Sequence, residues 1–299
     1  MIACNAHEAG DNWQMYLGDC CEVVAQLPDS SVDFSIYSPP FVSLFVYSDS
    51  ERDMGNCVDT NEFFQHYEFL IREKFRVTRP GRLSAVHCSD IPLRKWKDGV
   101  IGLDDFPGAI IAAHKAAGWV YHGRITIWRC PVVEMTRTKA LGLLYKQLKK
   151  DSSRSRPGLC DYLLIFRKDG DNERPITHEP EEFPVEQWQE WASPVWMTVR
   201  QTHTLNGAMA REAEDERHIC PLQLDVIERA LVLWSNPGDV VLSPFAGIGS
   251  EGVQSLKRRR KFVGVELKES YFRQAAKFLR EAERDAATPD LLSLMASVA

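Results

Sequence analysis

The stretch that most restricts the fold is "DVVLSPFAGIGSEGVQSLKRRRKFVGVEL", residues 239 to 267. An apolar strand candidate runs into a glycine-rich loop, a helix of amphipathic spacing follows, and a second apolar strand closes the unit. Two such strands joined through a helix lie parallel in one sheet, as in α/β proteins. The backbone N–H groups of the loop and the dipole of the helix make this turn a natural place to hold a ligand.

Three kinds of site compete for the loop "FAGIGSEG", 245 to 252. A phosphate-binding loop of the GxxxxGK[ST] type fails, because Val253 and Gln254 stand where Lys and Ser or Thr are required. A dinucleotide site fits GxGxxG, with Glu266 at the end of the next strand able to hold ribose hydroxyls. An S-adenosylmethionine site uses the same geometry, and the loop alone does not separate these last two.

The rest of the chain alternates in the same way. Strands are predicted at 14–17, 30–37, 82–88, 120–128 and 161–168, and helices at 22–27, 62–78, 105–119, 221–234 and 270–287. The strands at 120–128 and 161–168 are expected to pair as a late hairpin. We expect one domain, 1–299, with a basic insertion at 131–160 and an accessory, acidic and tryptophan-containing segment at 170–217.

Composition excludes several classes of protein. The net charge of -6 argues against a generally basic nucleic-acid binder but leaves room for a local basic groove. No apolar run approaches the roughly 18 residues of a membrane helix, which predicts a cytoplasmic protein without membrane partners. The 8 cysteines are scattered without CxxC or zinc spacing, so structural thiols and no metal are expected.

"SPPF", 38 to 41, follows a strand candidate with two prolines, which cannot continue a ladder or enter a helix. Alone it is typical of a stiff loop at a strand end. Together with four other stretches it resembles the amino-methylating DNA methyltransferases in their permuted motif order. Those stretches are "YLGDC" at 16–20, "HICPLQ" at 218–223, "SPFAGIGS" at 243–250 and "GVEL" at 264–267.

The resemblance spans about residues 16 to 280 and implies the Rossmann-like, S-adenosylmethionine-dependent methyltransferase fold. That fold is an α/β architecture with a mixed, mostly parallel seven-stranded sheet, helices on both faces and an antiparallel edge hairpin. Two positions depart from the family pattern: Ser243 replaces an acid, and Ile219 and Cys220 separate His218 from Pro221. The residues that the resemblance assigns to S-adenosylmethionine are Asp19, Pro221, Gln223, Ser243, Phe245, Gly247, Gly249, Ser250 and Glu266.

The tetrapeptide Ser38, Pro39, Pro40 and Phe41 is the implied catalytic loop. An exocyclic amine is a poor nucleophile because its lone pair is delocalised into the base. Acceptors on both sides of the amine, such as the Ser38 hydroxyl and a proline carbonyl held rigidly, draw its hydrogens out and favour attack on the methyl group. Phe41 would stack on a base flipped out of the duplex.

In the family, Ser at the first position usually accompanies the 4-amino group of cytosine and Asp or Asn the 6-amino group of adenine, so cytosine is favoured and adenine is the alternative. Double-stranded DNA is the expected partner; a homodimer, a cognate restriction enzyme and an RNA substrate stay open. Tryptophans of the accessory segment are candidates for target recognition or local core. The residues predicted to contact phosphates are Arg137, Lys139, Lys146, Lys149, Lys150, Arg154 and Arg156.

Two other classes of function remain as alternatives. A nicotinamide-dependent oxidoreductase is supported by GxGxxG and Glu266. A nucleic-acid-binding module with a degenerate cofactor pocket is supported only by Ser243 in place of the acid.

Overall fold

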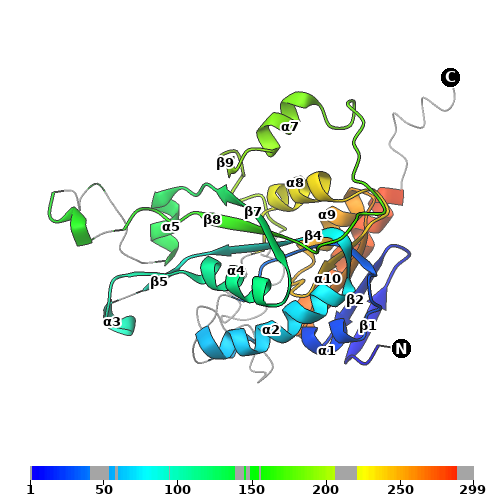
Figure 1. Cartoon of the computed structure of the whole chain (residues 1–299), viewed down its shortest axis with the longest axis horizontal. Helices are drawn as coiled ribbons and strands as arrows, with labels where there is room; N and C mark the ends of the chain where they lie inside the picture. The colour runs from blue at the N-terminus through cyan, green and yellow to red at the C-terminus, as the bar shows by residue number, and fades with distance from the viewer. Residues whose placement is uncertain are drawn as a thin grey trace.

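A computed structural model describes residues 2–40, 54–57, 60–93, 95–138, 145, 149–154, 156–205 and 221–287. Its centre is a sheet in the order β1-β2-β11-β10-β3-β4-β8-β7-β9 (Figure 1). Neighbouring strands from β2 through β11, β10 and β3 to β4 run parallel, whereas β8 lies antiparallel between β4 and β7. The strands are β1 Ala6–Ala9, β2 Trp13–Leu17, β3 Val32–Tyr37, β4 Thr78–Ser89, β7 Val120–Ile127, β8 Asp161–Arg167, β9 Val195–Trp196, β10 Val240–Ser243 and β11 Lys261–Glu266.

The mixed, mostly parallel sheet is confirmed, and so is the pairing of β7 with β8, but the predicted number of seven strands is wrong. All seven predicted strands form. A further strand is added at each edge: β1 pairs antiparallel with β2, and the two-residue β9 pairs parallel with β7. Both additions are short, and β9 contributes too few residues for an alternating pattern to be visible in sequence.

Helices cover both faces of the sheet, as predicted (Figure 1). One face packs on α8 Leu224–Trp234, α9 Ser250–Lys257 and α10 Glu269–Ala287. The other packs on α1 Cys20–Ala25, α2 Thr60–Val77 and α4 Phe106–Ala116. The strands supply both cores because successive side chains alternate: Phe34 and Ile36 face the first group of helices, whereas Tyr37 faces the second.

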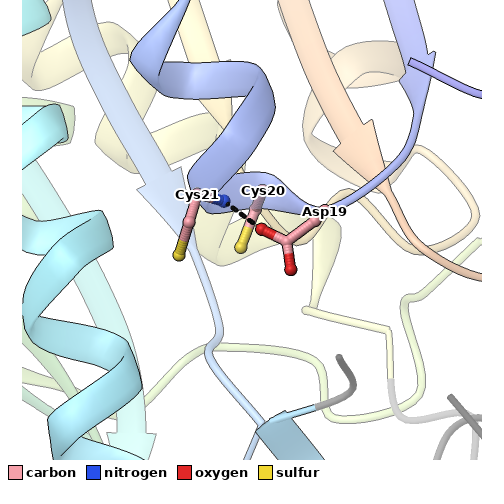
Figure 2. Close-up of side chains that lie close together, drawn as sticks. All are labelled: Asp19, Cys20 and Cys21. Atoms are coloured by element: carbon pink, nitrogen blue, oxygen red, sulfur yellow. Dashed lines mark hydrogen bonds between the residues drawn. The ribbon is translucent and has the colours of Figure 1, made fainter. Parts of the chain in front are cut away.

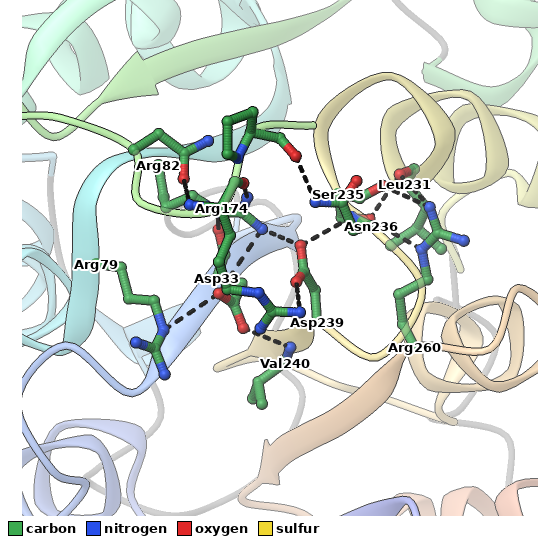
Figure 3. Close-up of polar contacts among 12 residues, drawn as sticks. Asp33, Arg79, Arg82, Arg174, Leu231, Ser235, Asn236, Asp239, Val240 and Arg260 are labelled. Atoms are coloured by element: carbon green, nitrogen blue, oxygen red, sulfur yellow. Dashed lines mark hydrogen bonds and ion pairs between the residues drawn. The ribbon is translucent and has the colours of Figure 1, made fainter. Parts of the chain in front are cut away.

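The amino edge of the sheet is held by a buried cluster of charges, drawn in Figure 3. The Arg82 guanidinium, 1 % exposed, pairs with Asp239 and donates through Nε to the Asp33 carbonyl at 2.9 Å. Asp33 in turn accepts the Val240 amide at 2.9 Å. These contacts join β4, β3 and the start of β10, so the three central strands keep their register at the edge remote from the loops considered below.

Several smaller elements lie outside the main sheet and the helices that cover it. They are the 3₁₀ turns η2 Met54–Asn56 and η3 Ser152–Arg154, the pair β5 Ile91–Leu93 and β6 Gly102–Asp104, and the helices α3 Lys95–Asp98, α5 Pro131–Thr138 and α7 Val185–Trp191. None of the helices that the structure describes has the length and apolarity needed to cross a bilayer.

The accessory segment contributes to the core. Trp196 is fully buried and donates its indole N–H to the Trp191 carbonyl at 2.9 Å, while the Arg229 guanidinium lies 5.3 Å from the Trp196 ring centroid. Trp188, in contrast, is 52 % exposed. Of these tryptophans, Trp188 alone has a large exposed surface. The residues 206–217 of this segment lie outside the described part of the chain.

Candidate active site

The loops of interest meet at the carboxyl edge of the parallel strands. β10 and β3 are neighbours in the sheet, yet the helix after β10 packs on one face and the helix after β3 packs on the other. The two loops therefore diverge to opposite sides, which is the topological switch point where open α/β sheets bind ligands. One of these loops begins at Ser243 and contains the glycines; the other begins at Ser38.

The glycine loop has the conformation its sequence requires. Gly247 and Gly249 have φ of +52° and +88°, in the left-handed region that favours glycine. A Cβ at Gly249 would lie 3.2 Å from the Ala275 Cβ of α10, whereas a Cβ at Gly247 would have nothing within 4 Å. Gly252 permits close helix–sheet packing, because a Cβ there would approach Leu279 at 2.5 Å. The loop is thus packed tightly behind and open at Gly247.

Glu266 ends β11 and is fixed against this loop. Its Oε2 accepts the Gly247 amide at 2.9 Å and its Oε1 accepts the Lys268 amide at 2.8 Å. Two backbone bonds hold the carboxylate plane in place, and because a carboxylate oxygen has two lone pairs, these bonds are compatible with accepting a ligand hydroxyl as well. Glu266 is therefore a positioned acceptor rather than a solvated strand-end charge.

Asp19 lies at the end of the neighbouring strand, β2. Its Oδ1 caps α1 by accepting the amides of Cys21 at 2.7 Å and Glu22 at 3.2 Å, and the adjacent Gly18 amide donates to the Glu266 carbonyl at 2.9 Å. Figure 2 shows Asp19 beside the thiols of Cys20 and Cys21, a set with ligand atoms close enough for one cation. A hydrogen bond to Cys21 and burial raise the pKa of the Cys20 thiol, which disfavours the thiolate a metal would need.

Three buried polar atoms have no hydrogen-bond partner among the described residues: Ser243 Oγ and Ser250 Oγ at the two ends of the loop, and Gln223 Oε1 at the start of α8. Buried polar groups are normally satisfied, so these atoms mark a place for a polar ligand. Gln223 is the N-cap residue of α8, and Pro221 lies half-buried two positions before it. Together with the open Gly247 and the fixed Glu266, they fit a cofactor that carries both a ribose and an amino-acid moiety.

Sequence inspection missed Glu251, the second residue of α9. Its side chain is buried, and burial raises its pKa to about 8, with the charge of Glu266 adding to the effect. The carboxyl group is therefore protonated at neutral pH. The only signal for Glu251 in the sequence is its position directly after the glycine loop.

The SPPF segment enters the site from β3. The Tyr37 ring lies 5.8 Å from the Phe245 ring, centroid to centroid, so the strand end before Ser38 contacts the cofactor loop directly. Below it, the buried Lys74 amine donates to the Tyr37 hydroxyl at 2.6 Å. Ser38 is half-buried, and Pro39 and Pro40 are buried; Phe41 lies outside the described residues.

Two more residues that the sequence did not single out lie beside Ser38. His87, at the end of β4, places Nδ1 3.3 Å from the Ser38 Oγ. Its Nε2 lies 3.3 Å from an oxygen of Asp161, the first residue of β8. Their positions, near the end of β4 beside β3 and at the start of β8 beside β4, were the available signal.

The predicted phosphate contacts fall into four groups. Lys149 and Lys150 are exposed; Arg137 lies in α5 and Arg154 in η3; Lys139 and Lys146 lie outside the described residues. Arg156 is instead buried, and its Nη2 pairs with Glu134 Oε1 at 2.9 Å. Its guanidinium forms this ion pair within the protein, so Arg156 is not among the residues proposed to contact DNA.

Comparisons with known proteins give the family and the fold of the chain. A family model described as DNA methylase, N6_N4_Mtase, matches residues 32–277. The type II methyltransferase M.BamHI of Bacillus amyloliquefaciens is 24 % identical over 273 residues, which cover 86 % of this chain and 55 % of M.BamHI. The chain thus spans about half the length of that relative.

Two solved structures share the fold. The Thermus thermophilus protein TTHA0409, solved with S-adenosyl-L-methionine, superposes with a TM-score of 0.68 at 23 % identity over 90 % of this chain and 93 % of its own. The cytosine-N4-specific PvuII DNA methyltransferase gives 0.63 at 16 % identity over 93 % and 92 %. The Rossmann-like methyltransferase fold is therefore confirmed. With the family match covering most of its length, the chain belongs to the DNA methylase family, the S-adenosylmethionine-dependent amino-methyltransferases that its motif order predicts.

Proposed function

We propose that this chain transfers a methyl group to the exocyclic amino group of a base flipped out of double-stranded DNA, with the 4-amino group of cytosine as the preferred acceptor. The observation that carries the proposal is the meeting of the SPPF segment and the glycine loop at one switch point, where Tyr37 contacts Phe245 at 5.8 Å. A cofactor seated on the loop and a base seated on SPPF would adjoin each other there.

Different residues are proposed to bind different parts of the cofactor. Glu266, with Asp19 at the next strand end, is placed to accept hydrogen bonds from the ribose and adenine end of the cofactor. Gln223, Ser243 and Ser250 offer buried polar atoms to the remainder. Bound S-adenosylmethionine supplies an electrophilic methyl sulfonium. The protein then needs chiefly to position the amine in line with it and to exclude water.

Ser38 and the rigid proline backbone act on the amine itself. The Ser38 hydroxyl and the Pro39 carbonyl accept its two hydrogens, which favours a pyramidal, nucleophilic nitrogen. The prolines fix φ and so keep the carbonyl from turning away. Phe41 is proposed to stack on the flipped base.

The choice of cytosine rests on Ser38 at the first position of the tetrapeptide. The family model covers both N6 and N4 acceptors, so the 6-amino group of adenine is the second candidate, favoured by the same clamp geometry. A nicotinamide site has less support, because nothing in GxGxxG chemistry accounts for the SPPF segment beside the loop.

DNA contact is proposed for the connection between β7 and β8. Ser89 at the end of β4 and Ile127 at the end of β7 both pair with Asp161, so this connection leaves the sheet at the same edge as the site. Lys149 and Lys150 are exposed on it. Lys139, Lys146, Arg137 and Arg154 are proposed to contact phosphates with them. A homodimer and a cognate restriction enzyme stay predictions from the resemblance.

The test is mass spectrometry of nucleosides from unmethylated DNA that has been incubated with the protein and methyl-labelled S-adenosylmethionine. Labelled 4-methylcytosine is expected. Labelled 6-methyladenine would support the second candidate instead. No labelled nucleoside from any DNA tested, with the cofactor bound, would overturn the proposal; label in RNA alone would move the function to another polymer.

A further inference from the structure

The Ser38 hydroxyl has polar partners in the protein that the SPPF chemistry does not use. Its Oγ lies 3.3 Å from the His87 Nδ1 and 3.3 Å from the His87 carbonyl. Both partners belong to one residue at the carboxyl end of β4. The hydroxyl that would accept a substrate hydrogen therefore lies within hydrogen-bonding distance of an imidazole.

The far side of that imidazole meets a buried carboxylate. His87 Nε2 and Asp161 Oδ2 lie 3.3 Å apart, an ion-pair distance, and neither of these buried atoms has a hydrogen-bond partner in the described part of the chain. Asp161 is 2 % exposed, and its other oxygen accepts a hydrogen bond from Arg129 Nη1 at 2.8 Å. A line of polar groups thus runs from Ser38 through His87 and Asp161 to Arg129.

The strand pattern explains why these groups meet. Ser38 follows Phe34 and Ile36 at intervals of two, and His87 follows Leu83 and Ala85 in the same way. Asp161 precedes Leu163 and Ile165. Because side chains alternate along a strand, the three polar residues share one face of the sheet at adjacent strand ends.

The charged group that faces the imidazole is Asp161 on β8, which also pairs with Arg129 after β7 at 2.8 Å. Arg200 and His203, which follow β9, bond to Asp225 of α8, and among the described residues none of the three bonds to His87. A carboxylate facing Nε2 favours the tautomer with the proton on that nitrogen. Nδ1 is then an acceptor for the Ser38 hydroxyl.

We propose that His87, oriented by Asp161, is a positioning residue that takes a proton from Ser38 during methyl transfer. The inference rests on the proposed function and deepens it. As the amino nitrogen bonds the methyl carbon, the carbon–sulfur bond breaks, its electron pair goes to sulfur, and the nitrogen becomes cationic. The nitrogen then gives a proton to the Ser38 Oγ while the Ser38 proton passes to His87 Nδ1. The imidazolium is stabilised by the Asp161 carboxylate and later loses its proton to solvent.

The first test is the pH profile of single-turnover methyl transfer, with enzyme in excess over the DNA. The wild type should lose rate as the pH is lowered, because an imidazolium cannot accept a proton. His87→Asn should lower the rate by about 10²-fold, with unchanged cofactor and DNA affinity, and should abolish that acid limb. His122→Asn, at an exposed histidine of β7, is the matched control.

A second variant keeps the histidine in place. Arg129→Gln leaves the Asp161 charge to His87 alone, so the acid limb should move to higher pH. Nitrogen-15 NMR of the ring should report Nε2–H in the wild type and a changed Nδ1 shift in Ser38→Ala. These two readouts apply even if His87→Asn fails to fold.

The possible outcomes distinguish failure of the proton relay from failure of the proposed function. An acid limb unchanged in His87→Asn and in Arg129→Gln, or ring shifts unaffected by Ser38→Ala, overturns the relay while wild-type methylation of DNA stands. A wild type that binds the cofactor but methylates no DNA overturns the proposed function, and the role given to His87 with it.

Discussion

Single residues at the carboxyl edge differ in how firmly the protein holds them. Glu266 is fixed by two backbone amides, from Gly247 and Lys268, before any ligand arrives. Ser38 is held through its hydroxyl by His87. Such prior placement reduces the ordering needed on binding, so the free energy of these contacts is available to the ligand.

Glu266→Gln should raise the Kd for S-adenosylmethionine about 10- to 100-fold. A hydrogen bond to a charged acceptor contributes about 1.5–3 kcal/mol, and the amide also presents a donor to the Gly247 amide. Isothermal titration calorimetry measures the change. Glu269→Gln, at an exposed residue that pairs with Arg273, is the control. Equal affinities for the wild type and Glu266→Gln would remove Glu266 from the cofactor site.

Lys74→Met should favour the folded state more at neutral pH than near pH ~10. Burial lowers the pKa of the Lys74 amine well below its usual value, so wild-type Lys74 carries a pH-dependent cost that methionine does not. Between the folded and unfolded pKa values the unfolded chain binds more protons, so wild-type stability rises with pH through this window. The advantage of methionine should therefore shrink as pH approaches ~10. Urea unfolding from pH 6 to 10 tests this, with exposed Lys115→Met expected to show no pH-dependent gain.

At the scale of elements, alternation and strand order assemble the site. β3, β4 and β8 each bring one polar residue to the same face at the same edge, while β10 and β11 bring the loop and Glu266. The opposite edge is fixed by Arg82. Errors in register there would shift every side chain at the carboxyl edge to the wrong face.

Arg82→Met should lower the free energy of unfolding by about 3–5 kcal/mol, because it leaves Asp239 and Asp33 without their buried partner. Arg79→Met is the matched control: its side chain is 41 % exposed and contacts the same Asp33, so a loss of about 0–1 kcal/mol is expected. Denaturant titration compares the two. Similar small losses would show that the cluster does not hold the strands.

Sequence predicted the elements better than the contacts between them. Apolar periodicity located all seven inner strands and the six helices that cover the sheet, because each buries a face of its own, but it did not locate α3, α5 or α7. It did not predict β9, which is too short for a pattern. It also placed Pro80 and Gly81 before the strand at 82–88, whereas both residues lie inside β4. Gly81 lies inside β4 with a φ of +73°, in the left-handed region that favours glycine.

The site was predictable where motifs are local. The glycine loop and Glu266 lie within one βαβ unit, so their spacing is informative. His87 and Asp161 are 74 positions apart, 161 minus 87, and meet only through the pairing of β4 with β8. Arg156 was predicted to contact phosphate for the same reason. Its partner Glu134 lies 22 positions away, so the ion pair is not visible in the local sequence.

For the whole molecule, the sheet divides the functions. Under the proposed function, its parallel centre holds the cofactor and the β3–β4 side carries the catalytic segment, and the β7–β8 connection with its exposed lysines leaves the same edge. Substrate and cofactor would thus approach one edge from two sides of the switch point. That arrangement accounts for an acidic protein with a local basic surface.

The central claim is that the two halves form one active site with separate tasks. The most direct measurement takes Ser38→Ala and determines, in the same preparation, its Kd for S-adenosylmethionine and its rate of methyl transfer to DNA. We predict an unchanged Kd and a transfer rate lowered by about 10²-fold or more. Full transfer by Ser38→Ala with the cofactor bound would contradict the account.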